Sequence, residues 1–187
     1  MAGGNGETVR HRAAIVGRAK DARTGEPLAG VRIEITAGPP AFAGRLALSA
    51  RDGFFHFLDL PAGRYTLSGS LPGSGTRYGT ATAEVLLSAD AQSNVVLGTA
   101  DLALPATTVQ GQVRSGPDAP VWMAEVRIQG SGESAWSDAK GNFVIAGLEA
   151  GTRRLIVTAR GFPLRSETVT LGRPGDMVTH DVTLSPS

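Results

Sequence analysis

The side chains best suited to metal chemistry are few and poorly spaced. The chain has three histidines, His11, His56 and His180, and no two of them stand at an H-x-H or H-x-x-x-H spacing that would hold a metal. It has no cysteine, which removes thiolate ligands and disulfides. We therefore expect no metal site and no cofactor.

Two segments resemble ligand-binding loops in composition, but each lacks part of the motif that such a loop requires. Ser137, Asp138 and Asn142 could offer oxygen ligands to calcium, but the spacing and terminal Glu of an EF-hand are missing. The glycine-rich segment Leu71–Gly79 lacks the Lys and the following helix of a phosphate-binding loop. We predict a hairpin turn for the first and a surface loop for the second.

Several aromatic and arginine side chains are instead candidates for contact with a partner. Phe42 lies in a Pro-Pro-Ala-Phe stretch with no core periodicity, and Trp122 and Trp136 flank a predicted strand. The candidate partner-binding residues are Phe42, Arg77, Tyr78, Trp122, Trp136 and Phe162. For the two tryptophans, an ordinary place in a hydrophobic core is the alternative interpretation.

Charge and hydropathy exclude two classes of partner. The formal net charge is +1, with 18 basic and 17 acidic residues, so no global field attracts nucleic acid. No apolar run approaches the ~18 residues of a membrane span, and Met1–Ala14 has no signal-peptide apolar region. We expect a cytoplasmic protein, as such or within an assembled particle, without nucleic-acid binding or membrane insertion.

An internal repeat organises the chain. The segment Asp52–Gly63 aligns with Lys140–Gly151 without a gap, and Val31–Ile33 recurs as Val126–Ile128. The copies open alike at Ile15–Ala19 and Val109–Val113, and we expect them to close alike at Val95–Leu97 and Val182–Leu184. The predicted boundaries are a flexible arm over 1–11, domain one over 12–98, a linker over 99–106 and domain two over 107–187.

Each repeat alternates apolar and polar residues with the period of a β-strand. Val31, Ile33 and Ile35 alternate with polar neighbours, and no segment sustains a helical period. The hairpins are predicted to place side chains of each repeat in its core: Phe55, Phe57 and Leu60 in the first, and Phe143, Ile145 and Leu148 in the second. Many short strands separated by Gly and Pro turns predict an all-β fold of two tandem sandwiches.

These motifs resemble the carboxypeptidase regulatory-like domain in two tandem copies. The residues that carry the resemblance are Gly17–Ala19, Thr24–Val31, Asp52–Phe55 and Leu60–Tyr65, with Ser137–Phe143 and Gly147–Gly151 in the second copy. The resemblance implies a seven-stranded transthyretin-like (Ig-like) β-sandwich and accessory rather than catalytic work. It also implies that Tyr65 is a core or corner aromatic.

Enzymes with a related fold do not match the chain. The Tyr-Arg-Gly-Ser end of hydroxyisourate hydrolases is missing, because the chain ends Asp181–Ser187. Intradiol dioxygenases bind iron through two Tyr and two His, but His56 and His180 are not the expected close pair. A Lys20–Asn94 isopeptide bond, as in related surface proteins, stays open at this point.

The sequence therefore predicts a protein that binds rather than catalyses. The leading hypothesis is a structural or adaptor protein that mediates protein–protein contacts in a multi-protein assembly, such as a phage-like tail or contractile injection system. The alternative is a surface or carbohydrate-binding module with a glycan ligand. A transthyretin-fold enzyme is the third hypothesis.

Overall fold

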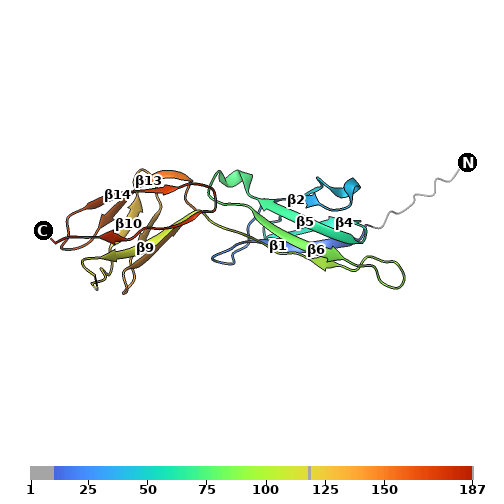
Figure 1. Cartoon of the computed structure of the whole chain (residues 1–187), viewed down its shortest axis with the longest axis horizontal. Coiled ribbons are helices and arrows are strands. Elements are labelled where there is room, and N and C mark those ends of the chain that lie inside the picture. The colour runs from blue at the N-terminus through green and yellow to red at the C-terminus, as the bar shows by residue number, and fades with distance from the viewer. Residues whose placement is uncertain (1–10, 118, 187) are drawn as a thin grey trace, which may run out of the picture. The chain divides into compact units, whose positions relative to one another are not determined.

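The computed structural model describes residues 11–117 and 119–186 (Figure 1). They form two compact units. The first unit holds residues 11–20, 26–69 and 82–102, and the second holds 21–25, 70–81 and 103–186. Two turns of the first sequence repeat, 21–25 and 70–81, therefore belong to the second unit.

The first repeat contributes eight short strands and two 3-10 turns. Its elements are β1 (Ala13–Asp21), β2 (Arg32–Ala37), η1 (Pro40–Phe42), β3 (Leu46–Leu48), β4 (Phe54–Leu58), β5 (Gly63–Ser70), η2 (Pro72–Ser74), β6 (Ala81–Leu87), β7 (Gly98–Thr99) and β8 (Leu102–Leu104). One sheet has the order β4-β1-β7, with β8 also on β1, and the other has the order β3-β2-β5-β6.

The second repeat reproduces this topology strand for strand. Its elements are β9 (Thr108–Arg114), β10 (Glu125–Ile128), β11 (Ser134–Trp136), β12 (Asn142–Ala146), β13 (Gly151–Thr158), β14 (Arg165–Leu171), β15 (Met177–Thr179) and β16 (Val182–Thr183). The sheets are β12-β9-β15, with β16 also on β9, and β11-β10-β13-β14. The prediction of two tandem all-β sandwiches is confirmed.

The last strand of each sandwich is interrupted, which gives eight pieces where seven strands are predicted. In the second repeat, β15 and β16 both run parallel to β9 and are separated at Asp181. Asp181 Oδ1 accepts a hydrogen bond from the Gln112 N–H at 2.9 Å, in place of a backbone carbonyl. Asp101 does the same with the Arg18 N–H of β1 at 3.0 Å.

The predicted core residues are buried. Phe55, Phe57 and Leu60 are 2–4% exposed, and their counterparts Phe143, Ile145 and Leu148 are 2–3% exposed. Each hairpin therefore sends alternate side chains inward, as the period of two requires.

Tyr65 is the corner aromatic that the family resemblance implies. Its ring is fully buried, and its hydroxyl donates a hydrogen bond to the Pro61 carbonyl at 2.9 Å. This bond to a residue four positions upstream is the tyrosine corner of Greek-key sandwiches.

Two details of the predicted repeat are wrong. The strand register aligns Ile33 with Val126, because Ile33 pairs with Ala47 and Val126 pairs with Ala135 at the same place in each hairpin. The predicted match of Val31–Ile33 to Val126–Ile128 is thus shifted by two residues.

The closing match is also wrong. The counterpart of Val182–Leu184 is β8, because both segments pair with the first strand of their repeat. Val95–Leu97 instead turns back toward the end of β6, with an isolated bridge between Ala89 and Val95. Part of the expected linker, 99–106, accordingly lies in β7 and β8.

The Lys20–Asn94 isopeptide bond does not form, because the two residues lie near opposite ends of β1. Asn94 Oδ1 accepts a hydrogen bond from the Arg12 guanidinium at 2.6 Å, just before the strand begins. Lys20 Nζ is bound to Asp101 at 3.2 Å near the end of the strand. The eight residue-to-residue steps from Arg12 to Lys20 span roughly 26 Å in an extended strand.

No helix among the described residues is long and apolar enough to span a membrane.

Candidate interaction surface

The predicted calcium-like turn uses its oxygens internally. Asp138 Oδ1 accepts hydrogen bonds from the N–H groups of Lys140 and Asn142, both at 2.8 Å, and Oδ2 accepts one from the Asn142 amide at 3.1 Å. Asp90 closes a similar turn onto Gln92 and Asn94. Within residues 11–117 and 119–186, no group of three or more His, Asp or Glu residues could hold a metal ion.

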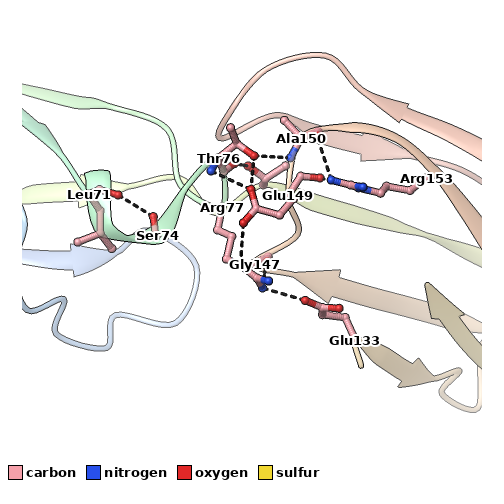
Figure 2. A network of polar contacts seen from close by, with 10 residues as sticks. Leu71, Ser74, Thr76, Arg77, Glu133, Gly147, Glu149, Ala150 and Arg153 are labelled. Atoms are coloured by element: carbon pink, nitrogen blue, oxygen red, sulfur yellow. Dashed lines mark hydrogen bonds and ion pairs between the residues drawn. The ribbon is translucent and has the colours of Figure 1, made fainter. Parts of the chain in front are cut away.

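Arg77 lies in a polar network within the second unit (Figure 2). Its guanidinium donates to Glu149 at 3.1 Å, to Glu133 at 2.8 Å and to the Gly147 carbonyl at 2.7 Å. These hydrogen bonds tie the segment 70–81 to two turns, the one between β12 and β13 and the one between β10 and β11.

Thr76 completes the network beside Arg77. Its N–H donates to a Glu149 carboxylate oxygen at 2.9 Å, and its hydroxyl donates to the same oxygen while accepting from the Ala150 N–H at 2.8 Å. Arg153 holds the turn from the other side through the Glu149 and Ala150 carbonyls, both at 2.9 Å. Figure 2 shows Thr76 and Arg77 directed at the Glu149 carboxylate, and Arg153 directed at the backbone of the same turn.

Charge stabilisation in the network is visible in its pKa values. The Ser131 hydroxyl and then the Arg77 guanidinium lower the pKa of Glu133 to about 2. The Thr76 hydroxyl and N–H lower the pKa of Glu149, and the Glu133 carboxylate raises the pKa of Arg77. The network is built to keep its carboxylates ionised and the loop attached.

Tyr78 is likewise engaged inside the protein. Its hydroxyl donates to Asp21 at 2.9 Å, and burial together with this bond raises the Tyr78 pKa to about 12. The sequence nominates Arg77 and Tyr78 as partner contacts, but the structure places their polar groups in contacts with the protein's own loops.

Phe42 and Phe162 are half-buried. The Arg45 guanidinium lies over the Phe42 ring at 4.8 Å from its centre, and Phe162 packs against the core of the second unit. Neither ring is presented freely to solvent.

Trp122 and Trp136 are the candidates that the structure leaves exposed, at 67% and 57%. Met123, which no pattern in the sequence marks, is 49% exposed beside them. The Met123 N–H donates a hydrogen bond to the Ser137 carbonyl at 3.1 Å. Met123 follows Trp122 and Ser137 follows Trp136, so this bond brings the two tryptophan-bearing segments together. We call Trp122, Met123 and Trp136 the tryptophan edge, because Trp136 belongs to β11, the edge strand of its sheet.

A buried serine fixes the backbone at this edge. Ser137 is 2% exposed, and its hydroxyl accepts from the Ala124 N–H at 2.8 Å and donates to the Val121 carbonyl at 2.6 Å. The turn Val121–Ala124 is therefore held at both ends by one side chain, with Trp122 and Met123 between them.

The first repeat contains the same device. Ser49 accepts from the Val31 N–H at 2.9 Å and donates to the Leu28 carbonyl at 2.6 Å. The two residues between these ends are Ala29 and Gly30. Met123 stands where the first repeat has Gly30, but alignment of the two serines in the sequence does not reveal this, because Ser49 follows Gly30 by 19 positions and Ser137 follows Met123 by 14.

The fold and this surface define a class of protein: two tandem β-sandwiches, the second of which exposes two tryptophans and a methionine at a strand edge. The chain belongs to the carboxypeptidase regulatory-like domain family, which matches residues 14–98 and 108–185. Comparison with curated proteins finds no match.

Several solved structures resemble the chain at low sequence identity. The Bacillus anthracis TIE protein is 16% identical with a TM-score of 0.41, over 93% of this chain and 34% of that one. The shaft pilin SpaA from Lactobacillus rhamnosus GG is 14% identical with a TM-score of 0.41, over 94% and 98%. A cohesin–X-dockerin complex from Acetivibrio cellulolyticus is 24% identical with a TM-score of 0.34, over 43% and 55%. The chain thus spans 34% of the TIE protein chain and 55% of the chain from the cohesin–X-dockerin complex.

Proposed function

We propose that this protein is a non-catalytic structural or adaptor protein that mediates protein–protein contacts in a multi-protein assembly. The observation that carries the proposal is the tryptophan edge, where two indole rings and a thioether are exposed on a backbone fixed by Ser137. Trp and Met are enriched in the cores of protein interfaces, and Trp is prominent among the residues that dominate binding energy there. A phage-like tail or contractile injection particle, assembled in the cytoplasm, is the assembly we propose.

A carbohydrate-binding module is the second candidate. Exposed tryptophan rings favour it, because an aromatic face packs well against an apolar sugar face. It predicts that Trp122 and Trp136 bind glycans in the isolated chain.

Sedimentation from the native host tests the proposal. The tagged full chain should sediment with a high-mass particle, and a Trp122→Ala/Trp136→Ala variant should shift to the soluble fraction. The matched control is Leu46→Ala/Leu48→Ala, which removes exposed apolar residues from the edge strand of the first repeat. Recovery of the wild type as a lone monomer that binds glycans would refute the assembly proposal and support the second candidate.

A further inference from the structure

The two serine-held turns differ at one conformationally demanding position. Gly30 has φ of 73° and Met123 has φ of 56°, so both occupy the left-handed region. A Cβ is disfavoured there, which makes Gly the expected residue. The second repeat nevertheless places Met at this position and Trp before it, and strain retained at a surface turn points to a role outside the fold.

The strand beside this turn has backbone groups that face away from the sheet. Hydrogen bonds from Ile128 N–H to Glu133 O, at 3.0 Å, and from Ser137 N–H to Ala124 O, at 2.9 Å, bracket β11. In an antiparallel pair the bonded positions alternate along the strand.

Ala135 therefore bonds to β10, whereas the N–H and C=O groups of Ser134 and Trp136 point to the free edge. Two residues of strand separate these groups by roughly 6.7 Å, which is the repeat of an incoming strand.

Natural edges are protected from strand addition by shortness, charged residues, proline or bulges. The β11 edge is short, with three residues, but it lacks the other three devices. Ser134, Ala135 and Trp136 include none of these residues, and β11 pairs with β10 without a register shift. Because Trp122, Met123 and Trp136 are exposed at this edge, a segment that complements it is apolar at its centre.

We propose that β11 accepts an extended segment of a partner protein as an added strand, with apolar side chains of that segment packed on the tryptophan edge. The inference rests on the proposed function and names the kind of contact through which it acts. Main-chain hydrogen bonds to Ser134 and Trp136 hold the segment, and Trp122, Met123 and Trp136 select its side chains. A sugar ligand would not require the N–H and C=O groups of Ser134 and Trp136, so their use distinguishes a bound strand from a bound glycan.

Peptide selection on the intact chain tests the proposal. The probe is a random twelve-residue display library panned against the full chain, followed by synthesis of the recovered peptides. We expect apolar residues at alternate positions in these peptides. In the ¹⁵N-labelled chain, a bound peptide should slow amide exchange at Ser134 and Trp136 at least tenfold and leave Ala135 unchanged, because that amide is already bonded.

Two variants examine the backbone and the side chains separately. Ser134→Pro removes an N–H that the fold does not use, and it should weaken peptide binding at least tenfold. Its control is Leu46→Pro at the equivalent place in β3, which should leave binding unchanged. Trp122→Ala/Met123→Gly installs the turn of the first repeat and should weaken binding at least tenfold, with the backbone NMR spectrum showing an intact fold.

Other occupants give distinct results. Failure to recover peptides that depend on Trp122 and Met123 overturns the proposal, and so does binding that leaves Ser134 and Trp136 exchange unchanged. Concentration-dependent self-association that the Trp122→Ala/Met123→Gly variant abolishes assigns the edge to a second copy and overturns it as well. Peptide binding without sedimentation in a native particle rejects only the proposed function, and sedimentation without peptide binding rejects only this inference.

Discussion

Gly111→Ala should unfold most of the second unit's closing strand. Gly111 lies in β9 with its Cα hydrogen facing the chain that connects β15 to β16. An added Cβ would overlap the His180 carbonyl oxygen, lie 2.6 Å from its carbon, and stand 3.1 Å from the Phe143 ring. A backbone carbonyl cannot rotate away as a side chain can, so β9 and the closing strand must separate.

The magnitude follows from what that separation exposes. Val182 and Leu184, which are 1% and 2% exposed, lie two and four positions after His180 and enter the core of the second unit. Full burial of such a side chain contributes about 1.5–3 kcal/mol, so release of both costs roughly 3–6 kcal/mol. A domain of this size has only about 4–12 kcal/mol of stability in total. The melting temperature of the second unit should therefore fall by at least about 12 °C.

Tryptophan fluorescence provides a selective assay, because both tryptophans of the chain, Trp122 and Trp136, lie in the second unit. Urea unfolding of Gly111→Ala followed at these residues should shift to lower denaturant, with the first unit's transition in circular dichroism unchanged.

The chain offers two controls for this experiment. Gly17→Ala should destabilise the first unit and leave the tryptophan transition unchanged, since its Cβ would overlap the Ala100 carbonyl in the first unit. Gly132→Ala, with open space around its Cβ, should change stability by less than about 0.5 kcal/mol. If Gly111→Ala unfolds at the same urea concentration as Gly132→Ala, the inferred close approach is wrong.

Four further variants test separate contacts. Met123→Gly should raise the second unit's stability by about 0.5–1 kcal/mol in urea unfolding, because it relieves the left-handed strain; a loss would contradict that strain. Tyr65→Phe should lower the first unit's stability by about 1–2 kcal/mol without moving the tryptophan transition, since it removes only the corner hydrogen bond. The pKa of Glu133 falls from 4.5 to about 2 on folding, so its stabilisation is complete above pH 4.5 and lost toward pH 2; Glu133→Gln should flatten this loss in acid unfolding. The pKa of Tyr78 rises from 10.0 to about 12, so its stabilisation is complete below pH 10 and lost toward pH 12; Tyr78→Phe should flatten that decline, and an unchanged slope would contradict the assignment.

The alternation of apolar residues was sufficient to predict the sandwiches but not the alignment of their strands. A period of two places Phe55 and Phe143 correctly inside, because a slip of one residue would expose them. A slip of two residues preserves every inward side chain, so the pattern could not distinguish the match of Val31 with Val126 from that of Ile33 with Val126. Only hydrogen bonds such as those of Ser49 and Ser137 fix that choice, and they join residues distant in sequence.

Only part of the candidate site can be predicted from the sequence, because the rest depends on contacts between residues that are distant in the chain. Composition nominates Trp122 and Trp136, but their exposure depends on a turn whose left-handed residue has no signature when it is not Gly. The sequence makes Arg77 a candidate partner contact, because nothing in it shows that Arg77 binds Glu133 and Glu149, which lie 56 and 72 positions away. No local pattern brings these groups together.

The duplication itself shows which surface features the fold does not require. In the first repeat a buried serine holds a turn of Ala29 and Gly30, and the sandwich closes with the same strand order. In the second repeat the same turn carries Trp122 and Met123, which add an exposed indole and a disfavoured backbone conformation. Both changes oppose stability and solubility, so the fold cannot explain them. Contacts outside the chain would explain them, and the partner that we propose would meet the tryptophan edge rather than Arg77, whose guanidinium already holds the protein's own loop.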